Sequence, residues 1–180
     1  MLSLTACGFQ LRDALTLPPD LGPVQVAVRD PYSALRQSLE TSLQRAGATV
    51  VPTTARDAGV STLRIVSELW DSEPIAVDER GRAQEFSLRY AAVFVLERAD
   101  GTVLVPRQAV ELSRDYVSLP GNSTGTESER ELLAREMQRE MTASILRRID
   151  AASRLTDGGE GEGEADVSLP LVPEGGDGRR

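Results

Sequence analysis

Hydrophobic residues along the chain follow two different spacings. Alternation of apolar and polar positions predicts four strands, at 24–28, 62–70, 85–96 and 102–110. Apolar residues that recur every four positions predict two helices, at 31–46 and 127–153. The order strand, helix, three strands, helix predicts an α+β fold in which two helices pack on one face of a small, about four-stranded mixed β-sheet.

The first predicted helix has an apolar row formed by Leu35, Leu39 and Leu43. Asp30-Pro31 is typical of a helix start, and Ser33 is an alternative N-cap. Gly47 is expected to end the helix as its C-cap. The second predicted helix carries a longer row (Leu133, Met137, Met141, Ile145 and Ile149). Both rows must be buried, and the apolar face of the sheet is the expected partner.

Two predicted strands show which face should be buried. In 62–70 the alternation places Leu63, Ile65 and Leu69 on one face, against Arg64, Glu68 and Trp70 on the other. In 85–96 it places Phe86, Leu88, Tyr90, Phe94 and Leu96 on one face, against Ser87, Arg89, Val93 and Val95.

Two turns separate the last three strands. Asp100-Gly101 predicts a tight hairpin, because both of its turn positions accept a positive φ. Residues 79–82 predict a looser turn before the middle strand. The stretch 15–23 is rich in proline and is expected to be an extended linker.

Composition excludes several kinds of chemistry. The 180 residues include no histidine and one cysteine, so the usual general base, an internal disulfide and a cysteine-rich metal cage are excluded. No nucleotide-binding or hydrolase motif occurs, and we expect no catalytic residues, no metal and no cofactor. A hydrolase of unrecognised type is the weakest alternative.

The net charge of −8 is concentrated at the C-terminus. Residues 157–180 hold seven acids and two arginines, which leaves −3 for the rest of the chain. A nearly balanced body does not fit nucleic-acid binding. The glycine-rich tail is expected to be disordered, because it cannot bury enough apolar surface. No apolar run approaches the roughly 20 residues of a membrane-spanning helix.

The N-terminal string Leu4-Thr5-Ala6-Cys7 is similar to a bacterial lipobox, in which a peptidase cuts before the cysteine and the thiol is acylated. The alternative is a free cysteine near a frayed end. Only six residues precede Cys7, fewer than an export signal needs, so we expect a start that lies further upstream or a trimmed sequence. The predicted organisation is a lipoprotein signal remnant at 1–7, an α+β domain at 8–156 and a tail at 157–180.

The arginines are the strongest remaining polar signal. Arg80 and Arg82 flank Gly81 at the looser turn, and Arg89 is close by in sequence. Guanidinium groups bind phosphate through two parallel hydrogen bonds, so this loop could hold a phosphorylated ligand. The alternative is a turn that only contributes solubility.

Several short motifs, in this order and spacing, resemble the lipopolysaccharide-assembly lipoprotein family LptE. They are 7–12 (CGFQLR), 83–90 (AQEFSLRY), 103–106 (VLVP), 111–116 (ELSRDY), 135–137 (REM) and 145–149 (ILRRI). The resemblance covers about residues 4–150 and leaves out the tail.

The resemblance implies a lipoprotein anchored through Cys7 on the periplasmic side of the Gram-negative outer membrane, with no enzymatic activity. Its implied partners are lipopolysaccharide and the LptD β-barrel, which it would plug and help to assemble. In the family, basic residues before the A-Q-E-F-type strand bind lipopolysaccharide, which points to Arg80 or Arg82, with Arg89 nearby. A second basic position falls within 122–127, where this chain has none, and Arg130 is the nearest substitute. The alternative is a periplasmic lipoprotein that acts as chaperone or pilot for another outer-membrane assembly.

Overall fold

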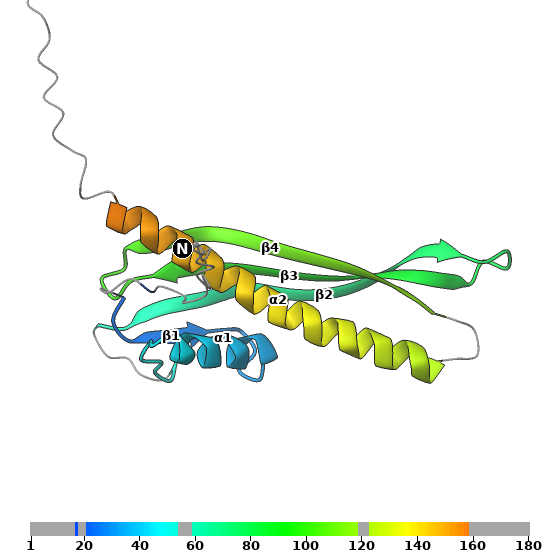
Figure 1. Cartoon of the computed structure of the whole chain (residues 1–180), viewed down its shortest axis with the longest axis horizontal. Helices are drawn as coiled ribbons and strands as arrows, with labels where there is room; N and C mark the ends of the chain where they lie inside the picture. The colour runs from blue at the N-terminus through cyan, green and yellow to red at the C-terminus, as the bar shows by residue number, and fades with distance from the viewer. Residues whose placement is uncertain (1–16, 18–20, 54–58, 119–122, 159–180) are drawn as a thin grey trace, which may run out of the picture.

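The computed structural model describes residues 17, 21–53, 59–118 and 123–158. The elements follow in the order β1 (Val24–Ala27), α1 (Ala34–Arg45), β2 (Ser61–Val77), β3 (Ala83–Glu97), β4 (Val103–Val117) and α2 (Ser123–Gly158) (Figure 1). Cys7, most of the predicted linker at 15–23 and residues 159–180 of the predicted tail lie outside the described residues.

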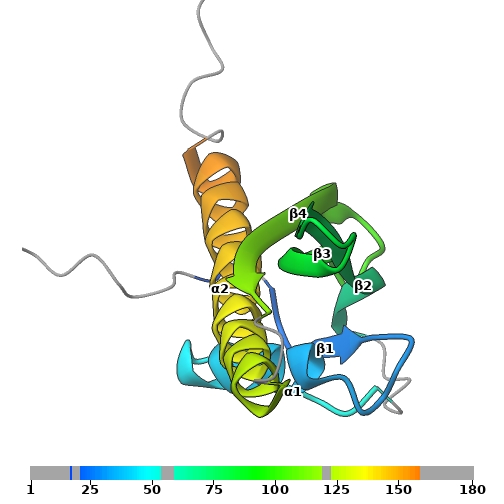
Figure 2. The ribbon, with the colours of Figure 1, turned by 90° about the vertical axis from the view of Figure 1, so that its right-hand side faces the viewer.

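The four strands form one sheet in the order β1-β2-β3-β4. β1 runs parallel to β2, whereas β2, β3 and β4 pair antiparallel, so the sheet is mixed. Both helices lie on the same face of the sheet, which Figure 2 shows end-on. The predicted α+β architecture is confirmed.

Local residue choices set the ends of α1. Ser33 is the N-cap, and its side-chain oxygen accepts a hydrogen bond from the Arg36 N–H at 3.4 Å. The helix therefore starts three residues later than predicted, because the Asp30 carboxylate accepts the Tyr32 N–H at 3.0 Å and holds that segment as a turn. Gly47 follows the C-cap in a left-handed conformation, with φ of 91°, as the sequence predicted for a helix end.

The core lies between the helices and the inner face of the sheet. Its helical part is the two predicted rows, Leu35, Leu39 and Leu43 with Met137, Met141, Ile145 and Ile149. The inner face of β3 contributes Leu88, Tyr90, Ala92, Phe94 and Leu96, as the alternation predicted. Leu21, which the sequence placed in the linker, is only 3% exposed and belongs to this core.

A β-bulge at Val66 exchanges the inward-facing and outward-facing side chains in the second half of β2. The ladder to β3 pairs Ile65 with Phe94 and Ser67 with Val93, so Val66 is an extra residue. Beyond the bulge, the side chains at 68 and 70 point to the helix side and Leu69 is 63% exposed. The prediction that Leu69 shares a face with Leu63 and Ile65 is therefore wrong, because one inserted residue shifts the two-residue period by one step.

The strands and α2 are longer than their sequence patterns. β2 continues past the polar stretch 71–74 to Val77, because β3 offers backbone partners as far as Ala83. β4 stops pairing at Val117, opposite Glu85. The β2–β3 hairpin therefore projects beyond the end of β4, at the right of Figure 1. α2 extends the predicted 127–153 at both ends.

The β3–β4 turn forms where the sequence placed it, but with a different backbone. Only Gly101 has a positive φ, of 86°, and Asp100 does not. The Gly101 N–H donates to the Arg98 carbonyl at 2.9 Å, and the Arg98 N–H donates to the Thr102 carbonyl at 2.8 Å. This is a longer hairpin loop closed by a left-handed glycine rather than the tight turn predicted.

Candidate functional site

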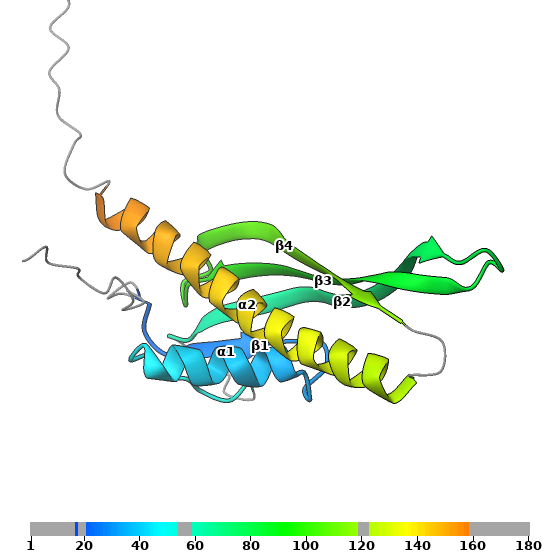
Figure 3. The same ribbon diagram turned by 45° about the vertical axis from the view of Figure 1, so that its right-hand side comes forward.

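The turn at the tip of the β2–β3 hairpin carries two of the predicted arginines. The Gly81 N–H donates to the Asp78 carbonyl at 2.9 Å, and the Asp78 N–H donates to the Arg82 carbonyl at 2.8 Å. Gly81 has a φ of 74°, which a side chain would strain. The turn thus presents Arg80 and Arg82 at the most distant end of the sheet (Figure 3).

The Asp78 carboxylate organises this turn. Its Oδ1 accepts the backbone N–H groups of Arg80 and Arg82, each at 2.9 Å, and its Oδ2 accepts the Arg82 guanidinium at 2.7 Å. These bonds, led by the backbone N–H of Arg82, hold the pKa of Asp78 below its usual 3.8. Among the described residues, the Arg80 guanidinium makes no hydrogen bond or ion pair, so of the two arginines in this turn it is the more available to an anion.

The other two predicted arginines lie elsewhere and have partners of their own. Arg89 is on the outer face of β3, and its Nε donates to Glu111 Oε1 of β4 at 3.2 Å. Hydrogen bonding to Glu111 raises the pKa of Arg89. Arg130, on α2, forms an ion pair with Glu127 at 2.7 Å, on the opposite side of the sheet. The structure brings only Arg80 and Arg82 together.

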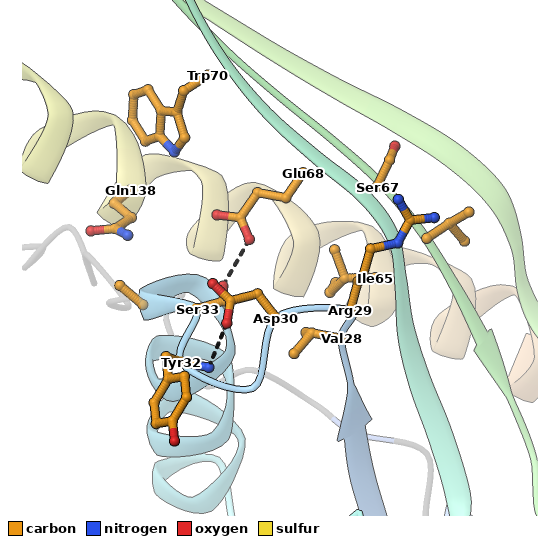
Figure 4. Close-up of a pocket in the computed structure, with 12 residues that line it drawn as sticks. Val28, Arg29, Asp30, Tyr32, Ser33, Ile65, Ser67, Glu68, Trp70 and Gln138 are labelled. Atoms are coloured by element: carbon orange, nitrogen blue, oxygen red, sulfur yellow. Dashed lines mark hydrogen bonds between the residues drawn. The ribbon is translucent and has the colours of Figure 1, made fainter.

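A pocket of about 470 Å³ lies beside β2, next to the connection between β1 and α1. Glu68, Trp70, Ser33 and Gln138 line it together with the apolar side chains of Val28 and Ile65 (Figure 4). The sequence pattern did not predict this pocket, because the alternation placed Glu68 and Trp70 on the outer face. Their spacing of two showed that they share a face, but only the bulge shows which face.

The Glu68 carboxylate is the polar centre of this pocket. Its Oε1 accepts the Tyr90 hydroxyl at 2.8 Å and its Oε2 accepts the Ser33 hydroxyl at 2.7 Å. The Tyr90 ring stacks on Trp70, with centroids 3.8 Å apart. Burial, with the bond to Glu68, raises the pKa of Tyr90 far above 10.0, so its hydroxyl stays a donor.

The part of the chain that the structure describes offers neither a membrane-spanning helix nor a cluster of metal ligands. There, none of the helices has the length and apolar character to cross a membrane. There too, no three histidine, cysteine or acidic side chains come close enough together to bind a metal ion.

Comparison with known proteins identifies relatives over most of the chain. The family model described as LptE, lipopolysaccharide-assembly, matches residues 21–149. An LPS-assembly lipoprotein LptE of Photorhabdus laumondii is 24% identical over 149 residues, which are 83% of this chain and 80% of the relative. One of Yersinia pestis is 25% identical over 154 residues, 83% of this chain and 70% of the relative.

Solved structures share the fold. A lipoprotein B of Nitrosomonas europaea superposes with a TM-score of 0.65 at 25% identity, covering 84% of this chain and 94% of its own. The rare lipoprotein B of Shewanella oneidensis has a TM-score of 0.64 at 19% identity, covering 76% of this chain and 99% of its own.

Proposed function

The chain belongs to the LptE family of lipopolysaccharide-assembly proteins, and from that premise we propose that it plugs and helps to assemble the LptD β-barrel and binds lipopolysaccharide during delivery to the outer leaflet. Membership itself gives a non-enzymatic role in lipopolysaccharide transport. Three points go beyond membership and are proposed here: the barrel partner, the lipopolysaccharide contact and the anchor through Cys7 in the outer membrane.

The part of the proposal that concerns the barrel rests on the outer face of the sheet. Within the described chain, no helix covers this face (Figure 2). Polar links cross it from strand to strand: an ion pair joins Arg64 to Glu97 at 3.1 Å, and a hydrogen bond joins Ser87 to Ser113 at 2.8 Å. The lumen of a large outer-membrane barrel is polar, so a domain seated there has to present such a surface.

The hairpin tip supports the lipopolysaccharide part of the proposal. Lipid phosphates carry the charge that paired guanidinium groups bind best. Arg80 has no described partner and can turn towards a phosphate, whereas Arg82, in the same turn, would have to exchange its contacts with Asp78 for it. Arg89 and Arg130, each already bound to a glutamate, are weaker candidates for this contact.

Co-expression with LptD tests whether the chain binds the LptD barrel. We expect the tagged full-length chain to copurify with LptD as a stable complex, with heat-modifiable folding of the barrel that depends on the chain. Copurification with a different outer-membrane assembly, and none with LptD, would contradict the proposal and support the pilot or chaperone alternative.

Replacement of the tip arginines tests the lipopolysaccharide contact. We expect Arg80→Ala with Arg82→Ala to weaken lipopolysaccharide binding about threefold to tenfold, in line with one to two partly exposed charge pairs. The matched control is Arg139→Ala with Arg147→Ala on α2, which removes the same charge from two exposed positions. Equal losses in both double variants would show that net charge alone acts, and LptD copurification should survive in each.

The anchor is tested separately in the full-length precursor. Because the thiol of Cys7 is the proposed acyl acceptor, Cys7→Ser should abolish incorporation of labelled fatty acid and release the protein from the outer-membrane fraction. Unchanged labelling would rule out the lipobox.

A further inference from the structure

Most of one edge of β2 has no strand beside it. β1 pairs only with Ser61 to Arg64, whereas β2 continues to pair with β3 as far as Val77. Among the described elements, only β1 and β3 pair with β2, so from Ile65 to Val77 its other edge is open (Figure 3). An open edge presents a row of backbone N–H and C=O groups that a further extended chain can pair with.

The open part of β2 is only partly protected as an edge strand, by the bulge at Val66, by its acidic side chains and by Pro74. Lysine, the residue that most often guards such edges, does not occur between 65 and 77, nor does arginine. Leu69, Ile75 and Val77 are instead exposed by 63%, 51% and 64%. A strand edge with exposed aliphatic side chains is typical of a docking surface.

The same segment is uniformly acidic. Glu68, Asp71 and Glu73 lie on it, with no basic residue among them, whereas in the turn that follows Arg80 and Arg82 balance Asp78 and Glu79. The Arg89 guanidinium of β3 is already hydrogen-bonded to Glu111, which raises its pKa, although Glu73 and Asp71 are close enough to raise it as well. An occupant with basic side chains would therefore complement this edge.

The pocket lies where the open edge begins. Ile65 to Trp70 form one wall, and the β1–α1 connection, which includes Arg29 and Asp30, forms the other. Glu68 accepts hydrogen bonds only from two neutral hydroxyl groups, those of Tyr90 and Ser33, and forms no ion pair in the described chain. In Figure 4 the indole nitrogen of Trp70 points into the space between Gln138 and Glu68. The Glu68 carboxylate suits a guanidinium or ammonium group, whereas the indole N–H is a donor and suits an acceptor beside it.

We propose that the open edge of β2 binds an extended polypeptide segment with basic side chains, which adds a strand next to Ser67–Val77 and places one arginine or lysine in the pocket against Glu68 and Trp70. A row of alternating backbone donors and acceptors fits a polypeptide better than a glycolipid, which has no matching repeat. A second copy of this chain is disfavoured, because two such acidic edges would repel one another. The proposal does not depend on the role with LptD.

Hydrogen–deuterium exchange with a designed peptide tests the pairing. The probe is a nine-residue peptide that alternates arginine with valine. The control is the same peptide with its valine nitrogens methylated, which keeps the charge but removes backbone donors. We expect the probe to slow amide exchange within 66–76 at least tenfold and leave α2 unchanged, and the control to have no such effect. Equal protection by both peptides would overturn the proposal, because charge alone would then explain binding.

Charge variants of the full chain test the complementarity. We expect Asp71→Asn with Glu73→Gln to weaken probe binding about threefold to tenfold, as two exposed pairs allow. The matched control, Glu129→Gln with Glu136→Gln, removes two exposed acids from α2 and should leave binding unchanged. Equal weakening in both would contradict the proposal. Protection of 66–76 by lipopolysaccharide micelles instead of the peptide, or by self-association in sedimentation, would assign the edge to another occupant and overturn it as well.

Discussion

The two hairpin turns of the sheet have the same backbone but lie in different surroundings. Gly101 closes the β3–β4 turn and Gly81 closes the β2–β3 turn, each with a positive φ and a 2.9 Å bond to the carbonyl three residues back. In both turns an aspartate accepts backbone N–H groups, Asp100 at one end of the sheet and Asp78 at the other. The two turns therefore share the features that close them, a left-handed glycine and an aspartate that accepts backbone N–H groups.

What differs is the additional chemistry. Asp100 binds the backbone and hydroxyl of Thr102, at 2.8 and 2.7 Å, and the strands behind it enter the core. Asp78 binds an arginine, a second arginine stands beside it, and the strands behind it carry exposed aliphatic residues. The β3–β4 turn also holds a basic residue, Arg98, so what distinguishes the projecting turn is the Arg80 guanidinium, which has no described partner. One end of the sheet belongs to the core, and the other is the end proposed to contact lipopolysaccharide.

The largest expected difference between the two ends is in stability. Leu96, just before the β3–β4 turn, is 1% exposed, and Leu96→Ala should lower the free energy of unfolding by about 2–5 kcal/mol. Val77, just before the β2–β3 turn, is exposed, and Val77→Ala should change it by less than about 0.5 kcal/mol. Urea unfolding followed by circular dichroism measures both. Similar losses would show that the projecting hairpin is as tightly packed as the core.

A smaller difference is expected at the two glycines. An added Cβ meets nothing within 4 Å at Gly81 or Gly101, so alanine would cost only backbone strain, about 1–2 kcal/mol. We expect Gly101→Ala to lower global stability by that amount. Gly81→Ala should lower it less, because the tip can open while the core stays folded. Urea midpoints together with amide exchange at 75–85 separate these cases, and equal midpoints would contradict this difference.

The smallest effect is electrostatic and should be alike at both ends. Hydrogen bonds from Arg82 and from Thr102 lower the pKa values of Asp78 and Asp100 below the usual 3.8. A lowered folded-state pKa stabilises the fold above the unfolded value, and this contribution is lost as the pH falls through the folded value. Carboxyl carbon shifts in an NMR titration should place both midpoints below 3.8. A midpoint above it in either residue would show that its turn opens in solution.

The sequence predicted well those features that depend on a few neighbouring residues. The leucine row of α1, the methionine and isoleucine row of α2 and the inner face of β3 all lie where their periods placed them. Gly81, Gly101 and Gly47 were placed at turns or helix ends, where the structure needs positive φ. The arginines at the tip were found as a candidate site, although their pairing with Asp78 was not.

Features that depend on distant partners were missed. The pattern of 62–70 gave Leu69 the buried face, and the bulge at Val66 gave that side to Glu68 and Trp70 instead. With them went the pocket, which needs Ser33 from another element to hold Glu68. The extension of β2 to Val77 was also missed, since its polar residues gave no alternating pattern.

The sequence by itself therefore determined the elements, the two buried rows and the turn positions of this protein. These depend on helical or strand period and on the φ that single residues allow, which are local properties of the chain. Tertiary structure alone decided the bulge, the open edge of β2, the pocket around Glu68 and the partners of the arginines. Each of these is set by which strand or helix arrives opposite a residue, and no local pattern contains that information.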